Sequence, residues 1–340
     1  MLACSVMICG AGAMIPTGAF AIDAACAPAA EPVISLDYGS RYTDDDKSRS
    51  TIDADSNEAV NTALRPVDDF IRDLVVGAND VLNETDPATA STAADCVLTQ
   101  IAVWARADAL SDLSSYTARL SVGARIGAIA EAYRQIRPQV TDLKAVADVD
   151  QWLIMRGDEQ LAFWEEEATS GARTGNLRAW AALALLNIGE VTDTDTFVWW
   201  AGASSVRILC TARDDGSLPQ ETKRGSYGLH YQFHALSPLV TIAARLDQAG
   251  MPITTVCNDA LTRVVDYAFN DLDQEGALTQ EYSGAQQSYF DGTETMEDHE
   301  LAFLGPYVTL FPQSNLAARA EGIESLSNSK LGGDQRLLWP

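Results

Sequence analysis

The stretch SLPQETKRGSYGLHYQFHAL concentrates the reactive side chains of this chain. It holds two adjacent cations, two tyrosines and two of the three histidines in a 340-residue protein of formal net charge −25. On a helix, four of its side chains would be three, four and three residues apart and would share one face: Arg224, Tyr227, Tyr231 and His234. His230 would lie on a neighbouring face. An Arg can hold a carboxylate through paired hydrogen bonds, and a Tyr beside cations loses its proton more easily than at its ordinary pKa of ~10. The pattern indicates a cleft for a carboxylate-bearing ligand or, equally, side chains that satisfy one another between helices.

Helical periodicity must supply the elements that position these groups. It is clearest in residues 57–75, where apolar residues recur every three or four positions. Breakers such as Gly77 and Pro138 separate the patterns, and strand patterns are scarce. We therefore expect an all-α fold of helical hairpins stacked in a ring or solenoid. The other helical ranges are 93–112, 116–137, 149–167, 176–188, 193–212, 229–249 and 253–269.

Two polar stretches fall outside these helices. Residues 37–56 are dense in charge, and residues 271–298 are rich in Gly, Ser, Gln and acids with little apolar content. Both are typical of mobile surface loops or, equally, of solvated linkers.

The first 21 residues carry no charge and end in Ala19-Phe20-Ala21. This pattern predicts a secretory signal peptide, residues 1–21, cleaved before a single mature domain, residues 22–340; the alternative is a short buried helix. No other apolar stretch approaches the ~20 residues of a membrane span. All 48 acidic residues lie beyond the signal, which argues against binding nucleic acid or anionic membranes. We expect an exported protein, periplasmic or secreted.

Four cysteines remain after the signal: Cys26, Cys96, Cys210 and Cys257. An even number in an oxidising compartment permits two disulfides, whose pairing spacing alone does not fix. None forms a Cys-x-x-Cys pair, so we expect no metal site.

The segment DGSLPQETKRGSYGLHYQFHALSPL resembles the G-x-L-P-x-E-x-x-R stretch, followed seven residues later by a Tyr, in the alginate lyases (mannuronate lyases) of polysaccharide lyase family 5. Further resemblances cover nearly all of the mature chain in order: SLDYGSRYTDDDKSRSTID, CVLTQIAVWARADALSD, IGAIAEAYRQIR, LAFLGPYVTLFP and KLGGD. The resemblance implies an all-α, incomplete α/α toroid with a substrate groove across one end. It also implies a disulfide between Cys26 and Cys96, which leaves Cys210 and Cys257 as the remaining pair.

The family chemistry implied by this resemblance is β-elimination on a uronic-acid polymer, without metal or other cofactor. The enzyme neutralises the carboxylate, removes the proton at C5 and protonates the departing oxygen at C4. By matching position, Tyr231 would be the acid and also the base. Arg224 would hold the carboxylate, and Asn176 would help to neutralise it.

Substrate contacts are implied as well. Arg41 and Tyr42 would belong to a lid loop, and Lys330 matches a substrate-binding position. Tyr133 matches a groove-lining helix, where binding and packing are equally expected. A basic strip that includes Arg178 and Lys223, together with His230, would add positive charge. We expect a monomer whose partner is an anionic or mixed polysaccharide.

One position departs from the family pattern. Where the family has its catalytic His, this chain has Leu177, preceded by Asn176 and by Gly175 in place of a first Asn. Tyr231 could suffice with Arg178 or His230 supplying charge, or the substrate could be a different uronate. Alternatively, catalysis is lost, since removing one member of a coupled catalytic set often costs ~10³-fold. The chain would then be a glycan-binding protein of exopolysaccharide export. A glycoside hydrolase ranks last, because no acid pair lies near the quoted helix.

Overall fold

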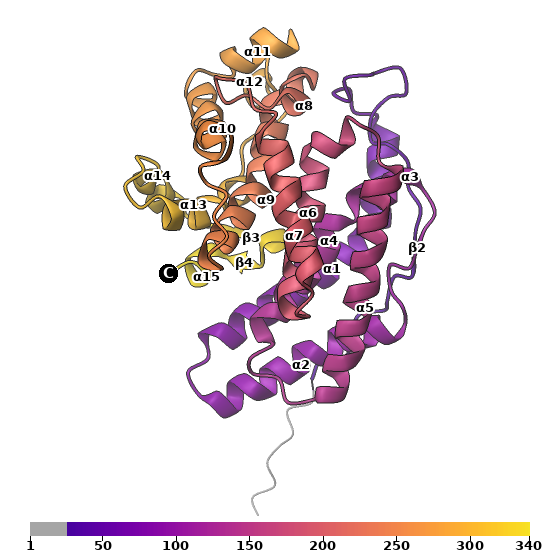
Figure 1. The fold of residues 1–340 in the computed structure, drawn as a ribbon. Helices are drawn as coiled ribbons and strands as arrows, with labels where there is room; N and C mark the ends of the chain where they lie inside the picture. The colour runs from indigo at the N-terminus through magenta and orange to yellow at the C-terminus, as the bar shows by residue number, and fades with distance from the viewer. Residues whose placement is uncertain (1–25) are drawn as a thin grey trace, which may run out of the picture.

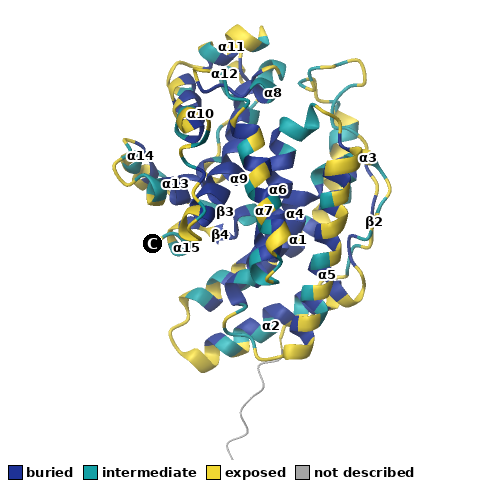
Figure 2. Ribbon diagram, viewed as in Figure 1, coloured by how far each residue is buried: buried dark blue, intermediate teal, exposed yellow. Residues whose placement is uncertain are grey.

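The structure, a computed structural model, describes residues 26–340, so the expected signal peptide lies outside the described residues. Helical hairpins pack around three central helices, α4 (Gly123–Ile136), α6 (Asn176–Val191) and α9 (Gly228–Gln248) (Figure 1). These central helices are buried over most of their length (Figure 2). Because α6 is apolar on nearly every face, it can only be accommodated with neighbours all around it.

The outer helices and short segments complete the ring and close its ends. The longer helices are α1 (Ala54–Asn83), α2 (Pro87–Arg106), α5 (Leu143–Ala162), α7 (Asp195–Leu209) and α10 (Val256–Asp273). The shorter helices are α3 (Tyr116–Ser121), α8 (Pro219–Thr222), α11 (Ala277–Ser283), α12 (Ser288–Asp291), α13 (Leu304–Leu310), α14 (Ala317–Gly322) and α15 (Gln335–Leu338). Single turns are η1 (Phe163–Glu167), η2 (Ala172–Thr174), η3 (Gly225–Tyr227), η4 (Asp298–Leu301) and η5 (Ser329–Leu331).

Several boundaries differ from the sequence prediction; α2, for example, spans Pro87–Arg106 where residues 93–112 were expected. The prediction that Gly77 ends the first helix is wrong, because α1 runs on to Asn83. A Cβ at Gly77 would lie 2.8 Å from Val97 Cγ2, so the glycine lets α2 approach closely instead of breaking the helix. The expected helix 116–137 is divided at Val122 into α3 and α4.

The prediction of a loop over residues 271–298 is also wrong in part, since α11 and α12 form there. Buried polar groups stabilise this segment together with Tyr289, Phe290 and Met296, which pack against the core. Asp271 accepts hydrogen bonds from the backbone N–H groups of Leu278 (2.7 Å) and Thr279 (3.1 Å) at the start of α11. Composition alone underestimates such a segment, because its stabilising contacts are hydrogen bonds.

The polar stretch 37–56 forms a defined turn. A bridge pairs Tyr42 with Ile52, and the Asp46 carboxylate accepts hydrogen bonds from the backbone N–H groups of Ser48, Ser50 and Thr51 at 2.6–2.8 Å. These bonds hold the Asp46 pKa far below its ordinary value, the Ser48 hydroxyl contributing most. The turn lies at the end of the molecule where α8 and the start of α9 are found (Figure 1).

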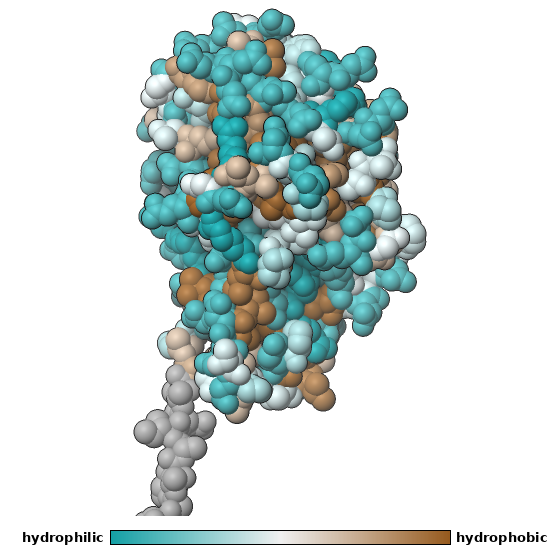
Figure 3. All heavy atoms as spheres, turned by 90° about the vertical axis from the view of Figure 1, so that its left-hand side faces the viewer, coloured by the Kyte–Doolittle hydropathy of each residue, from teal (hydrophilic) through white to brown (hydrophobic). Residues whose placement is uncertain are grey.

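Strands are minimal in the described chain. β1 (Ser35–Leu36) pairs in parallel with β2 (Asp112–Leu113), and β3 (Ser327–Asn328) pairs antiparallel with β4 (Gly333–Asp334). None of the helices within residues 26–340 combines the length and apolar character needed to cross a membrane. One face, shown in Figure 3, is mainly hydrophilic with separate apolar patches.

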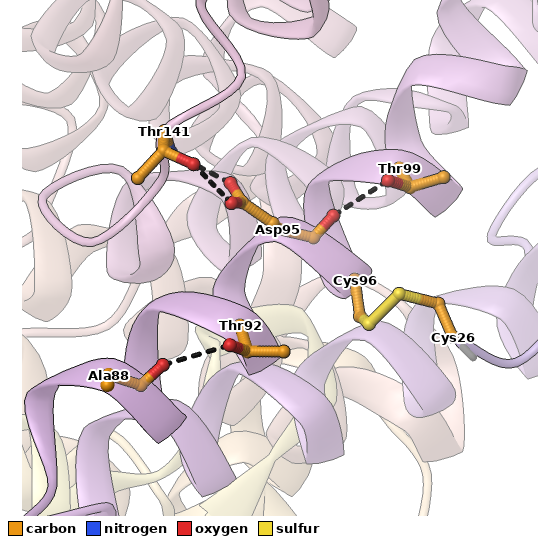
Figure 4. The surroundings of a disulfide bond; sticks show 7 residues. All are labelled: Cys26, Ala88, Thr92, Asp95, Cys96, Thr99 and Thr141. Atoms are coloured by element: carbon orange, nitrogen blue, oxygen red, sulfur yellow. Dashed lines mark hydrogen bonds between the residues drawn. A yellow bond between two sulfur atoms is a disulfide. The ribbon is translucent and has the colours of Figure 1, made fainter. Parts of the chain in front are cut away.

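Two disulfides are present. Cys26 is joined to Cys96 on α2, which confirms the predicted pair, and beside it Asp95 accepts hydrogen bonds from Thr141 (Figure 4). Cys210 is joined to Cys257, the remaining option. The bonds close segments of 70 and 47 residues. Such long closures restrict the unfolded chain and so stabilise the fold.

Candidate active site

The connection between α8 and α9 places Arg224 against the turn formed by residues 37–56. α8 begins at Pro219, where the missing N–H leaves no helix bond unmade. Gly225 has φ +53°, and a Cβ there would lie 2.8 Å from the Cβ of Ser50. A larger residue at 225 would therefore be strained and would displace the turn. The glycine allows the turn to close against the residue that carries the guanidinium.

The Arg224 guanidinium lies over the ring of Tyr231, with 3.9 Å between Cζ and the ring centroid. The ring of Tyr42 lies 5.6 Å from the same carbon, and Nη2 donates to the carbonyl oxygen of Arg49 at 3.1 Å. Cation–π contacts on two sides fix the guanidinium. Its Nε–H is buried and has no hydrogen-bond partner within the described chain. A buried donor of this kind is costly unless a ligand completes it.

Asn176 is the first residue of α6, and Glu221 of α8 determines how it lies. Glu221 Oε1 accepts from the Asn176 backbone N–H and Oε2 accepts from its Nδ2, both at 2.7 Å. Glu221 is fully buried, and this burial raises its pKa, although the charge of Arg224 opposes the shift. With Nδ2 committed to Glu221, Asn176 presents its Oδ1 toward α9. Nδ2 carries a second N–H besides the one bonded to Glu221, so the expected role of Asn176 as a donor to a carboxylate stays a prediction.

The ring of His234 lies next to that oxygen. Its Nδ1 lies 3.1 Å from Asn176 Oδ1 and 3.1 Å from Trp180 Nε1, which donates to it. Burial, together with the charges of His230, Lys330, Arg224 and His299, lowers the His234 pKa well below 6.5. The ring is therefore neutral at neutral pH.

A cleft of about 450 Å³ opens beside these groups, between α1, α6, α9 and the C-terminal segment. The ring centroid of Tyr231 lies 5.1 Å from that of His230 and 6.2 Å from that of His234, so Tyr231 stands at the edge of the cleft. The cleft is lined by Asp68, Arg72, Trp180, His230, His234, Ser237, His299, Glu300 and residues 327–330.

Lys330 brings positive charge to the wall of the cleft. Burial lowers its pKa to about 8, assisted by the charges of Arg125 and Arg41 and opposed by Asp68. At neutral pH the ammonium is thus largely charged and incompletely solvated, which suits the binding of an anion. Arg41 lies behind the turn, where Nη1 donates to the side-chain oxygens of Asn57 and Asn61.

His230 lines the same cleft but faces acids. Its Nδ1 lies 3.3 Å from a Glu294 oxygen, 3.5 Å from a Glu300 oxygen and 3.3 Å from the Tyr289 hydroxyl. Tyr42 is half-buried, and burial raises its pKa against the opposing charges of Arg224 and Arg41. His230 can thus contact a ligand, but its nearest charges are negative.

Three expected site residues lie outside the cleft. Tyr133 is fully buried and donates its hydroxyl hydrogen to Asp150 at 2.6 Å, so packing is the role that its placement supports. Arg178 is buried against Glu165 (2.6 Å), because residues two apart on a helix face nearly opposite ways and Asn176 takes the cleft side. Lys223 is exposed at the end of α8 and is not part of the cleft wall. Tyr133 and Arg178 cannot touch a ligand in the cleft.

Leu177 occupies a hydrophobic environment. It is half-buried and packs against the cluster formed by Phe163, Trp164, Ala168 and Ala181. Two residues of the site, Glu221 and Trp180, are not predicted by the sequence as site residues, and His234 is predicted only as part of the stripe, without a role. His234 shares a helix face with Tyr231, which was a usable indication, but its link to Asn176 joins residues 58 apart.

Comparison with known proteins now bears on this geometry. The alginate lyase family model matches residues 127–278. A polysaccharide lyase of Stenotrophomonas maltophilia is 29% identical over 96% of this chain and 95% of its own length. An alginate lyase of Pseudomonas paraeruginosa is 26% identical over 88% of this chain and 81% of its own. The likeness to alginate lyases therefore extends along nearly the whole chain.

Solved structures agree on the fold. An alginate lyase A1-III variant complexed with a tetrasaccharide superposes with a TM-score of 0.78 at 19% identity, covering 92% of this chain and 85% of its own. Alginate lyase A1-III from Sphingomonas species A1 gives a TM-score of 0.71, also at 19% identity, over 92% of this chain and 86% of its own. The prediction of an all-α, incomplete α/α toroid is confirmed. The likeness to these relatives supports a polysaccharide lyase.

Proposed function

We propose that this protein cleaves a uronate-containing polysaccharide, polymannuronate or an alginate-like polymer, by β-elimination. We further propose that residues 1–21 direct its export and that it acts as a monomer in the periplasm or outside the cell. The two disulfides support an oxidising compartment.

The reaction has three requirements. A base removes the proton at C5, the electron pair left behind forms the C4–C5 double bond, and the C4–O4 bond breaks as O4 takes up a proton. Before this, the carboxylate on C5 must be neutralised, since it otherwise resists further negative charge. Arg224 can hold that carboxylate through its guanidinium, and Tyr231 can take the C5 proton and return one to O4.

The observation that carries this proposal is the contact between Arg224 and Tyr231. Two groups with complementary roles lie at the edge of a cleft, with 3.9 Å between Arg224 Cζ and the Tyr231 ring centroid. A site in which charge develops on a carboxylate needs such preorganised donors.

The acidic surface does not prevent a polyanion from binding. At physiological salt the screening length is ~8 Å, so charges within the cleft determine the local attraction. Arg224, Arg72 and Lys330 lie in or beside the cleft. Asp46, part of the acidic run in the turn, is occupied by backbone N–H groups.

The test is a panel of polymannuronate, polyguluronate, polyglucuronate and bacterial exopolysaccharides, followed by the ultraviolet absorbance of the unsaturated product. Tyr231→Phe should abolish elimination and leave the fold intact. Tyr282→Phe is a matched control, because Tyr282 is exposed and donates to Asp215 away from the cleft. Undiminished turnover by Tyr231→Phe, or no turnover of any polymer by the wild type, contradicts the proposal.

Leu177 favours one alternative, a catalytically impaired glycan-binding protein that serves exopolysaccharide export. A leucine neither accepts a proton nor donates to a carboxylate. This alternative predicts that a polymer of the panel binds, as measured by calorimetry, while its length stays constant by size-exclusion chromatography. The same samples therefore separate the two functions.

A further inference from the structure

We propose that His234 supplies the imidazole of this active site, with Nε2–H donating to the uronate carboxylate from α9 in place of a side chain at position 177. The inference rests on the proposed elimination and adds one catalytic residue to it. It also explains how a chain with Leu177 can retain the chemistry.

His234 is placed where it can reach the carboxylate of a sugar bound at Tyr231. His234 lies one helical turn after Tyr231, on the same face of α9, and their ring centroids are 6.2 Å apart. The ring lines the cleft and is half-buried. A sugar whose C5 proton meets Tyr231 would have its carboxylate, one bond from C5, within reach of this imidazole.

The contacts of His234 Nδ1 determine which ring nitrogen carries the proton. An indole nitrogen is a donor only, so Trp180 requires Nδ1 of His234 to be an acceptor. A neutral imidazole with a bare Nδ1 carries its proton on Nε2. Nε2 forms no hydrogen bond within residues 26–340 and is not among the solvent-inaccessible unpartnered atoms, so it is open to the cleft. The ring thus presents a free donor to a ligand.

Residues of α6 and α8 lie next to the His234 ring and limit its movement. Glu221, fully buried, fixes Asn176 through two 2.7 Å bonds, and Asn176 Oδ1 lies 3.1 Å from Nδ1. Trp180 of α6 therefore orients the ring through its bond to Nδ1, while Asn176 Oδ1 contacts the ring as a second acceptor and forms no hydrogen bond with the bare Nδ1. Preorganised donors of this kind lower the cost of charge development, because they need no rearrangement during the reaction. At 177, by contrast, the side chain packs against the cluster containing Phe163 and Trp164.

A substrate whose carboxylate is already neutral separates a catalytic role from a structural one. His234→Phe should lower kcat/KM about 10²-fold or more on the free-acid polymer, a loss typical of a missing oxyanion donor. On the methyl-esterified polymer the loss should fall below about tenfold, because the ester needs no neutralising donor. Tyr231→Phe should lose as much on the ester as on the free acid. A loss from His234→Phe that is equal on both polymers, or no loss at all, overturns the proposal.

Two further measurements guard against misfolding and against a merely structural role. Trp180→Phe removes the contact at Nδ1 but keeps the imidazole, so its loss should be smaller than that of His234→Phe. Imidazole ¹⁵N shifts should report the Nε2–H tautomer in the free protein and should move when a uronate trisaccharide binds. An Nδ1–H tautomer, or unmoved shifts in the complex, counts against the role of His234. An active wild type that is insensitive to His234→Phe refutes only this inference, whereas an inactive wild type refutes the proposed function.

Discussion

Glu221→Gln tests whether a buried carboxylate organises the site. Glu221 accepts two hydrogen bonds from Asn176, one from its backbone and one from its side chain, each 2.7 Å long. A glutamine keeps one acceptor oxygen but turns an NH₂ group toward the other donor. One charge-assisted bond is lost, and a donor faces a donor in a place without solvent.

The expected loss of unfolding free energy follows from these contacts. A hydrogen bond to a charged group contributes about 1.5–3 kcal/mol, and an unsatisfied buried donor costs about 1–3 kcal/mol. Burial also raises the Glu221 pKa, so removing the charge recovers part of this cost. We expect a net destabilisation of about 2–4 kcal/mol. Displacing Asn176, and His234 with it, should lower kcat/KM about 10–100-fold, because small misplacements of a site are costly.

Urea unfolding with both disulfides intact measures the stability change, and the absorbance assay measures the rate. Glu166→Gln is the matched control, since Glu166 is exposed on η1 and changes at such positions usually stay within about 0.5 kcal/mol. A Glu221→Gln enzyme as stable and as fast as this control would refute the reasoning. Lost stability with full activity would refute only the link from Glu221 to catalysis.

Three further predictions concern charge, covalent closure and the turn. The pKa of Lys330 is about 8, so the ammonium is charged below that pH and loses its charge above it. The affinity for a uronate oligosaccharide, measured by calorimetry, should therefore fall from pH 7 to pH 9. Lys330→Met should remove the part of this pH dependence that the ammonium causes. Replacing Cys26 and Cys96 by Ser should lower the free energy of unfolding by about 4 kcal/mol, from the 70-residue closure, in urea unfolding against the wild type. Asp46→Ala removes the acceptor of three backbone N–H groups, so proteolysis within residues 40–52 should become faster. KM should rise several-fold, with kcat less affected. Unchanged proteolysis would show that the turn does not depend on Asp46.

Much of the fold was predictable because its determinants are local. The apolar spacing of α1 and α6 specifies helices whatever their neighbours are, and the strand patterns were rightly judged scarce. The sequence predicts that Arg224 and Tyr231 share a helix face; the two do meet, but Arg224 lies before η3, outside α9, and reaches Tyr231 from the preceding turn. The family resemblance added the toroid and the Cys26–Cys96 pair, which no periodicity contains.

Contacts between distant segments were beyond the sequence. The sequence predicts a helix break at Gly77, whereas the structure shows that this glycine lets Val97 of α2 pack closely against α1. Arg178 belonged to the expected basic strip, yet its face of α6 is turned to Glu165. In both cases the residue type was read correctly and the neighbour was unknown.

The sequence by itself determined that this chain is helical and that Tyr231 and His234, three residues apart, share one face of α9. Helical spacing is a property of a few adjacent residues, so it is written in their order. Only the tertiary structure decided that Asn176, held by Glu221, would meet His234 at 3.1 Å. That meeting depends on how α6, α8 and α9 pack, and packing is set by the shape of the whole core rather than by any segment of it.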